Sequence, residues 1–131
     1  PWRHEPSLPA LAEWADFLVI AVAGGPQTRH LVNEAVLQAL GPQGIVVNVA
    51  RGSVIDEAAL IACLRDGRLG AAGLDVFENE PQVPAELRAM EQVVLAPHMA
   101  SGTRETRQAM ADMTLANLAA GLAGLALVAR A

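Results

Sequence analysis

Residues 46–56 read VVNVARGSVID, and this stretch predicts the fold of the chain. An apolar run ends at Arg51 and Gly52, and a candidate helix N-cap, Asp56, follows a few residues later. In a parallel sheet covered by helices, a buried strand is apolar throughout and delivers functional groups to the edge where such folds bind ligands. Arg51 is therefore the first candidate site residue.

Similar apolar segments alternate with helical patterns along the chain. Strands are expected over residues 17–23, 44–49, 71–76 and 92–96. Helices are expected over residues 8–15, 34–40, 57–66 and 103–121, the first three capped by Ser7, Asn33 and Asp56. The run from Phe17 has no polar alternation, which is typical of a strand covered on both faces. The alternation predicts an α/β fold with a parallel sheet and right-handed crossovers, ending in a long helix.

Composition narrows the class of protein. The 131 residues are 53% hydrophobic, which is enough for the core of one domain. A net charge of −5 without a basic cluster argues against a nucleic-acid partner. The longest apolar tract, residues 118–129, is shorter than the roughly 20 residues that span a bilayer, so no membrane partner is expected. Cys63 and the methionines are expected in the core, and a single cysteine predicts a reduced, cytoplasmic setting without a thiolate metal site.

Five polar residues follow or end predicted strands, namely Thr28, Arg51, Asp75, Glu80 and His98. The carboxyl ends of parallel strands meet at one edge of a sheet, so these side chains are expected to gather there. The other two histidines, His4 and His30, lie in polar loop contexts and are expected at the surface.

Each candidate has a functional and a structural interpretation. Arg51 could hold a 2-oxo acid through two parallel charge-assisted hydrogen bonds, or it could pair with an acid of the fold. His98 could protonate a developing alkoxide, or it could be a loop histidine satisfied by the backbone. A neighbouring carboxylate would favour the imidazolium, and both Glu80 and Glu78 could supply one. Asp75 ends an apolar strand and needs donors there, which a nicotinamide carboxamide or backbone amides could provide.

Three linked segments resemble the signatures of the D-isomer-specific 2-hydroxyacid dehydrogenase family. They are NVARGSVIDE at residues 48–57, GLDVFENEP at residues 73–81 and APH at residues 96–98, in the order and at close to the spacing of the family. Residues 99–107 look most like the glyoxylate/hydroxypyruvate reductase branch. The resemblance implies a Rossmann-like sheet, NAD or NADP as cofactor, a small 2-oxo acid as substrate and a homodimeric parent protein.

The resemblance also implies a role for each candidate. Arg51 would bind the substrate carboxylate and carbonyl oxygen, His98 would be the general acid in reduction, and Glu80 would orient and charge His98. Asp75 would accept a hydrogen bond from the nicotinamide carboxamide. The positions implied to lie along the cofactor are Val22, Thr28, Val49, Ala50, Arg51, Asp75, His98, Ala100 and Ser101.

One departure from the family pattern concerns the cofactor. No G-x-G-x-x-G motif occurs in the sequence, although its glycines and the following helix cradle the pyrophosphate. The chain thus resembles the second half of a dinucleotide-binding domain. Residues 1–120 are expected to form a partial NAD(P)-binding domain without the glycine-rich first βαβ unit, and residues 121–131 a helix end and tail. Such a fragment is expected to be inactive by itself, with the residue that selects NAD or NADP lying before Pro1.

Two other functions deserve comparison. A nucleotide-sensing binding protein of the corepressor type shares this fold and these motifs, and turnover against cofactor-dependent partner binding would distinguish it from an enzyme. A formate dehydrogenase is disfavoured, because that branch pairs its histidine with a glutamine where this sequence has Glu80.

Overall fold

The computed structural model describes residues 3–129, and the chain divides between His98 and Met99 into two units. The first unit is an α/β sheet with helices, as expected, and the second contains one long helix. In order, the elements are α1 (Leu8–Trp14), β1 (Phe17–Ile20), the 3₁₀ helix η1 (Pro26–Thr28), α2 (Glu34–Leu40), β2 (Ile45–Asn48), the 3₁₀ helix η2 (Gly52–Val54), α3 (Glu57–Arg65), β3 (Ala71–Leu74), α4 (Ala85–Ala89), β4 (Val93–Leu95) and α5 (Arg104–Leu122).

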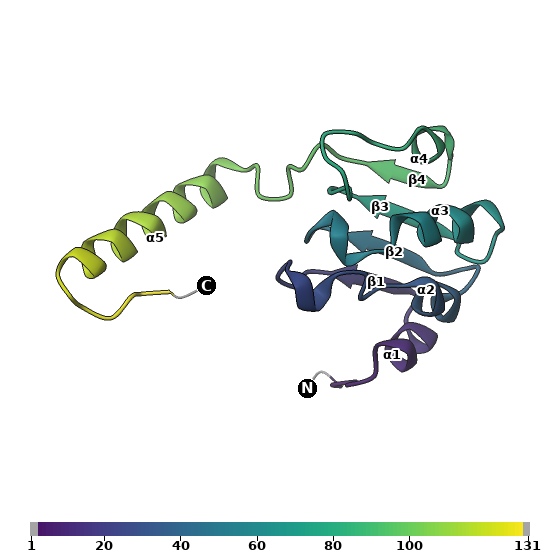
Figure 1. Ribbon diagram of the computed structural model, residues 1–131, viewed down its shortest axis with the longest axis horizontal. Helices are drawn as coiled ribbons and strands as arrows, with labels where there is room; N and C mark the ends of the chain where they lie inside the picture. Colours follow the sequence, from purple (N-terminus) through teal and green to yellow (C-terminus); the bar gives the residue numbers. More distant parts are fainter. Residues whose placement is uncertain (1–2, 130–131) are drawn as a thin grey trace. The chain divides into compact units, whose positions relative to one another are not determined.

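The sheet of the first unit is parallel throughout, with the strand order β1-β2-β3-β4 (Figure 1). Its register sets the last residues of the strands side by side: Ile20 pairs with Asn48, Asn48 with Leu74, and Leu74 with Leu95. The loops that leave these four residues therefore begin at one edge. This alignment is the physical basis for a site built from residues far apart in the sequence.

Local capping explains where the helices begin. The side chains of Ser7, Asn33 and Asp56 accept hydrogen bonds from the backbone N–H groups of Ala10, Val36 and Ala59. Each cap satisfies a donor that the first helical turn leaves without an intrahelical partner. Thr103 caps α5 in the same way through the N–H of Thr106. The short helix α4 has no side-chain cap, and the sequence patterns did not indicate it.

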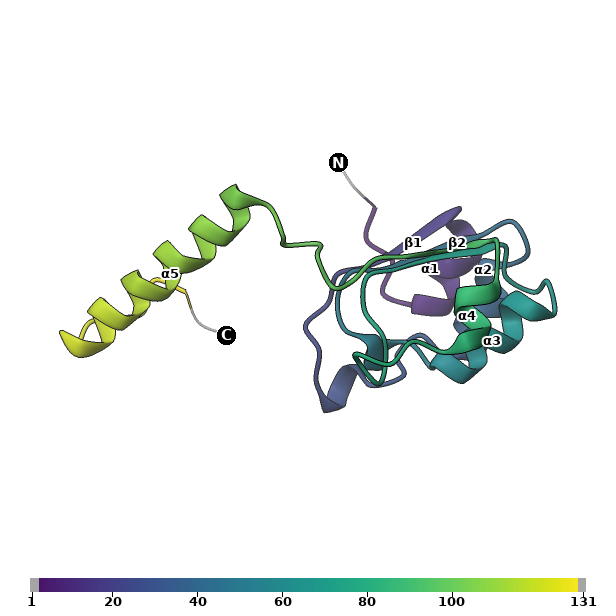
Figure 2. The same ribbon diagram turned by 90° about the horizontal axis from the view of Figure 1, so that it is seen from above.

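The expectation that the first strand is covered on both faces is wrong. Phe17 and Val19 are 64% and 60% exposed, whereas Leu18 and Ile20 are almost fully buried. Helices α2, α3 and α4 lie on the same side of the sheet (Figure 2), so alternate residues of β1 face away from them. The core lies between this side of the sheet and the helices, and its fully buried side chains include Leu37, Val46, Val54, Leu60, Cys63, Leu69 and Leu87.

The second unit consists of α5 and a tail that folds back on it. Asn117 holds the tail, donating from Nδ2 to the Ala129 carbonyl at 2.8 Å and accepting from the Ala129 N–H at 3.1 Å. No described residue of α5 is buried. Met110 and Met113 are exposed in this unit taken by itself, so the core position expected for them stays a prediction. Among residues 3–129, no helix has the length and apolar character needed to cross a membrane.

Candidate active site

The turn that carries Arg51 is held by a buried asparagine. Asn48 ends β2 and is 1% exposed. Its Oδ1 accepts from the Ala50 N–H at 3.0 Å, and its Nδ2 donates to the Arg51 carbonyl at 2.9 Å. An asparagine can provide both bonds because its amide has an acceptor and a donor on one planar group. No role was predicted for Asn48 from the sequence, although a short polar residue that closes an apolar strand is a known turn signal.

Gly52 brings the Arg51 turn against a second loop. A Cβ at residue 52 would overlap the carbonyl carbon and oxygen of Phe77 and the backbone nitrogen of Glu78. Glycine is needed here for close backbone approach, since only it presents no side-chain atom to that peptide. The loop after β3, which carries the candidate Glu80, is therefore packed directly on the residue after Arg51.

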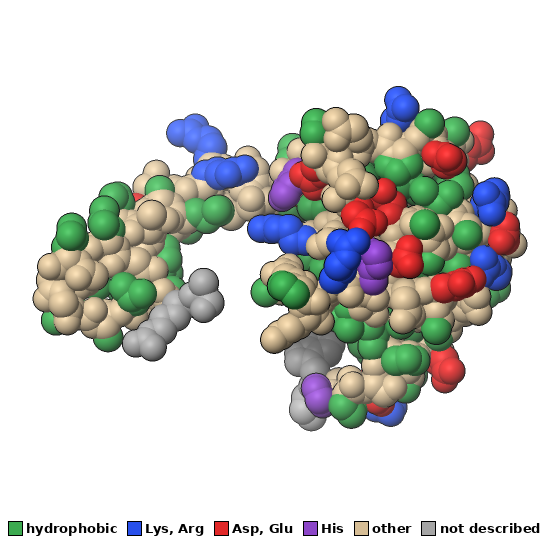
Figure 3. All heavy atoms as spheres, viewed as in Figure 1, with side chains coloured by type: hydrophobic (Ala, Val, Ile, Leu, Met, Phe, Trp, Pro, Cys, Tyr) green, Lys and Arg blue, Asp and Glu red, His purple; other side chains and the backbone are tan. Residues whose placement is uncertain are grey.

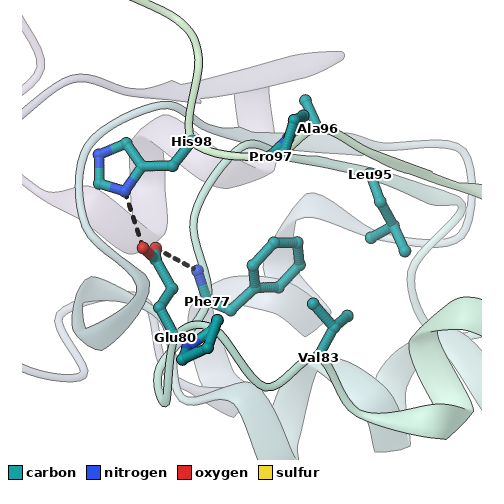
Figure 4. Close-up of a pocket in the computed structure, with 8 residues that line it drawn as sticks. Phe77, Glu80, Val83, Leu95, Ala96, Pro97 and His98 are labelled. Carbon is teal, nitrogen blue, oxygen red and sulfur yellow. Dashed lines mark hydrogen bonds and ion pairs between the residues drawn. The ribbon is translucent and has the colours of Figure 1, made fainter.

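Glu80 and His98 form a direct pair. Glu80 Oε2 lies 2.8 Å from His98 Nδ1, and Oε1 accepts from the Phe77 N–H at 3.1 Å (Figure 4). The hydrogen bond with His98 is the main reason that the pKa of Glu80 lies below its usual range. A carboxylate accepts hydrogen bonds only, so Nδ1 carries the proton and Nε2 is the ring atom that can exchange one.

The backbone also fixes the position of His98. Its N–H donates to the Asp75 carbonyl at 2.8 Å, and its φ of 52° lies in the left-handed region that few residues other than glycine adopt. Residues in such conformations persist where the surrounding contacts hold them, and they cluster at functional sites. The end of β3 thus holds the histidine main chain, while the loop that follows β3 holds its ring.

Arg51, Glu80 and His98 line one hollow of about 620 Å³, together with Gly24, Gly25, Gly52, Ser53, Phe77, Glu78 and Asn79. Acidic, basic and histidine side chains gather on this face of the first unit (Figure 3). A second, apolar pocket of about 330 Å³ shares Phe77, Glu80 and His98 with the first and is otherwise lined by residues of the 81–83 and 95–97 segments (Figure 4). The histidine–glutamate pair therefore lies between a polar hollow and an apolar one.

Four residues expected along a cofactor line a further hollow at the ends of β1 and β2. Val22, Val49 and Ala50 contribute to it, with a volume of about 480 Å³, and Arg51 lies at its border with the polar hollow. Val22 and Val49 are 42% and 39% exposed, so apolar surface is available there to a flat ring.

The other expected cofactor residues have different surroundings. The Thr28 hydroxyl donates within its own loop, to the Ala23 carbonyl at 2.9 Å, which leaves only its lone pairs for a ligand. Asp75 is buried at the end of β3. Ala100 and Ser101 belong to the second unit, so their place along a cofactor stays a prediction. Within the described part of the chain, no group of three or more His, Cys, Asp or Glu side chains could hold a metal ion.

Glu78, the alternative partner for His98, has other contacts. Its Oε1 accepts from Arg29 Nη2 at 2.8 Å and lies 2.9 Å from His30 Nε2. The expected surface position holds for His4, which is exposed, and His30 lies at the surface with its side chain 34% exposed. Glu57 accepts a hydrogen bond from the Glu78 N–H at 3.2 Å. Sequence patterns gave no signal for these contacts, because they join the loop after β3 to α3 and to the loop before α2, 21 and 48 positions away in the sequence.

Comparison with known proteins identifies the family of the chain. The family model described as D-isomer specific 2-hydroxyacid dehydrogenase, NAD binding domain, matches residues 3–100. The chain belongs to this family. It is 49% identical over 127 residues to glyoxylate/hydroxypyruvate reductase A of Arabidopsis thaliana, a match that covers 97% of this chain and 41% of that protein. Hydroxyphenylpyruvate reductase of Plectranthus scutellarioides is 50% identical over 118 residues, covering 90% of this chain and 38% of its own length.

Solved structures of the family have the same fold. An NADPH-dependent glyoxylate/hydroxypyruvate reductase from Sinorhizobium meliloti, solved with NADP and malonate, superposes with a TM-score of 0.84 at 49% identity. That match covers 88% of this chain and 36% of the other. The chain therefore spans about two-fifths of the length of the family members to which it is similar.

Proposed function

We propose that this chain carries the substrate-binding and proton-transferring residues of an oxidoreductase that transfers hydride between NADH or NADPH and a short 2-oxo acid of the glyoxylate or hydroxypyruvate type. The observation that supports it most is the Glu80–His98 pair, at 2.8 Å, in the same hollow as Arg51. An acid held by a carboxylate, next to a guanidinium that can hold the substrate, suits the reduction of a 2-oxo acid.

In this proposal the Arg51 guanidinium binds the substrate carboxylate and orients the C2 carbonyl group toward His98. The reduced nicotinamide, when bound, supplies the hydride that C2 accepts. His98 gives the proton on Nε2 to the carbonyl oxygen, which becomes the hydroxyl of the product. Glu80 holds the ring through Nδ1 and stabilises its positive charge before the transfer. In the reverse direction the neutral imidazole takes the proton back.

In this proposal the cofactor site combines residues of this chain with a pyrophosphate-binding turn outside these 131 residues. The hollow lined by Val22, Val49 and Ala50 offers apolar surface for the nicotinamide ring. Since the sequence contains no G-x-G-x-x-G motif, we propose that residues 1–120 are part of an NAD(P)-binding domain whose pyrophosphate-binding turn lies outside these 131 residues. Cytoplasmic location and a homodimeric assembly belong to the same proposal, and light scattering after size-exclusion chromatography tests the latter.

A chimera tests the function directly. The residues of this chain that match the S. meliloti reductase, 88% of this chain, would replace the matching segment of that enzyme. NADPH oxidation would be followed with glyoxylate and hydroxypyruvate. The chimera should turn over both acids. His98→Ala should lower kcat/KM by about 100-fold or more, the range found for loss of a general acid. Arg51→Ala should raise KM for the 2-oxo acid by about 10- to 100-fold, as expected for lost charge-assisted hydrogen bonds.

Arg65→Ala is the matched control, because this exposed arginine pairs only with Asp66 among the ion pairs of the described residues. A folded chimera that binds NADPH without turnover, or one in which His98→Ala retains full activity, would contradict the proposal. Turnover also separates an enzyme from a corepressor-type binding protein. The relatives named above are all called reductases, so they do not favour the corepressor alternative.

A further inference from the structure

The segment Phe77–Glu80 positions the carboxylate that holds His98. The position of this segment depends on its own contacts with the rest of the first unit. On one side it lies against Gly52. On another side, Glu57 Oε2 accepts a hydrogen bond from the Glu78 N–H at 3.2 Å. Glu57 is the first residue of α3, directly after its cap Asp56. The side chain of the first residue of α3 therefore bonds the main chain two residues before Glu80.

We propose that Glu57 is a positioning residue for the Glu80–His98 pair, acting through the backbone of Glu78. The inference rests on the proposed function, in which His98 is the proton donor. The chain of contacts has three links: Glu57 to the Glu78 N–H, the Phe77 N–H to Glu80 Oε1, and Glu80 Oε2 to His98 Nδ1. Displacing the Glu78 peptide moves the base of the loop from which Glu80 projects.

The Glu78 side chain also bonds a second loop that contributes to the lining of the hollow. Its Oε1 bonds both Arg29 and His30, and its side chain is 18% exposed. The loop that ends at these two residues contributes Gly24 and Gly25 to the hollow, and the His30 N–H donates to the Ser53 carbonyl at 2.8 Å. The main chain of Glu78 is thus bonded by α3, and its carboxylate is bonded by the 24–30 loop. The 24–30 loop is also bonded to the Arg51 turn through Ser53, so hydrogen bonds connect the 24–30 loop, the Arg51 turn and the loop after β3.

Glu57 has a competing role as an acid in the first turn of α3, where a negative charge interacts favourably with the helix dipole. That effect needs a negative charge. Positioning the Glu78 peptide needs only an acceptor oxygen, which the side-chain amide of glutamine also provides. Glu57→Gln and Glu57→Ala therefore separate the two roles. Glu34 offers the matched control, since it is the first residue of α2, follows the cap Asn33 and bonds Gln38 and Arg68 instead.

The first measurement uses the 131-residue chain and needs no turnover. Amide hydrogen exchange by NMR reports on the Phe77 N–H, which bonds Glu80. In Glu57→Ala this amide should exchange about tenfold faster, the effect of losing roughly one hydrogen bond of support. Glu57→Gln should restore the protection to within about twofold, and Glu34→Ala should leave it unchanged. Equal exchange at Phe77 in the wild type and Glu57→Ala, or equal acceleration in Glu57→Ala and Glu57→Gln, would overturn the inference.

The second measurement uses the chimera. Glu57→Ala should lower kcat about tenfold with an unchanged KM for NADPH, because the loss falls on proton transfer and not on cofactor binding. Glu57→Gln should recover kcat, whereas a charge-dependent role of Glu57 would leave it low. Failure of the wild-type chimera to turn over would contradict the proposed function, and the exchange measurement would still decide the role of Glu57 in holding the loop.

Discussion

Gly52 lies so close to Phe77 that a Cβ at residue 52 would overlap the Phe77 carbonyl group. The contact joins the turn that carries Arg51 to the loop that carries Glu80, and both partners are backbone atoms of buried residues. Neither can move aside as a flexible side chain would. The position of the Arg51 turn relative to the loop that carries Glu80 therefore depends on the close contact between Gly52 and Phe77.

Gly52→Ala should therefore destabilise the chain and disturb the site together. Overpacking of a well-packed interior typically costs about 1–3 kcal/mol, and a backbone neighbour favours the upper end of that range. Urea unfolding measures the loss, and kcat/KM of the chimera should fall as well. Gly25→Ala is the control, since nothing lies within 4 Å of its Cβ position and its φ of 163° is extended backbone. Equal stability of the two variants would contradict the argument.

Gly24→Ala should have a more selective effect. A Cβ there would come within 2.5 Å of Arg51 Cγ, and that side chain can move. We expect little loss of stability but a higher KM for the 2-oxo acid, because the guanidinium is displaced from the substrate carboxylate. Steady-state kinetics of the chimera tests this, with the KM for NADPH as internal reference. A change confined to the KM for NADPH would contradict this expectation and indicate that Gly24 contributes to the cofactor site.

Asn48→Ala should cost about 2–4 kcal/mol in the free energy of unfolding. The substitution leaves the Ala50 N–H and the Arg51 carbonyl without their partner, and a buried unsatisfied group costs about 1–3 kcal/mol. Denaturant titration measures the effect, with the exposed Gln43→Ala as control. A loss as small as that of the control would mean that the turn does not depend on the Asn48 amide.

The lowered pKa of Glu80 predicts that the stability of the fold decreases in acid. Its hydrogen bond with His98 lowers its pKa from the ordinary value of 4.5, so the ionised form is favoured in the fold. The stabilisation is fully present above pH 4.5 and is lost as the pH falls through the lowered pKa. The difference in Tm between the wild type and Glu80→Gln should shrink as the pH falls below 4.5 through the lowered pKa of Glu80. A difference that grows as the pH falls below 4.5 would have the wrong sign.

The raised pKa of Glu57 predicts the opposite dependence of stability on pH. Burial raises its pKa above 4.5, and the nearby Glu78 carboxylate adds to the effect against a hydrogen bond that lowers it. The contribution to stability is fully present below pH 4.5 and is lost as the pH rises through the raised pKa. Glu57→Gln should thus be at least as stable as the wild type at neutral pH, with the two melting curves converging in acid. Thermal unfolding between pH 4 and pH 8 tests this.

The sequence by itself determined the elements and their class. Side-chain caps act within one turn, so Asn33 and Asp56 predicted the starts of α2 and α3 correctly. Apolar runs separated by helices predicted the parallel sheet, and the register then brings the ends of the strands to one edge. Strand ends were less accurate: the first strand was expected to reach residue 23 and ends at Ile20. The three linked motifs indicated the family that the comparisons confirm.

Only the tertiary structure decided which groups meet. Both Glu78 and Glu80 were candidates from spacing alone, and the fold sets Glu80 on His98 while Glu78 bonds Arg29 and His30. The exposed face of β1 was also invisible in the sequence, because an apolar run does not reveal which of its sides a helix covers. The physical reason is common to these cases. Caps and strand periodicity are local, whereas contacts between loops depend on the packing of the whole domain.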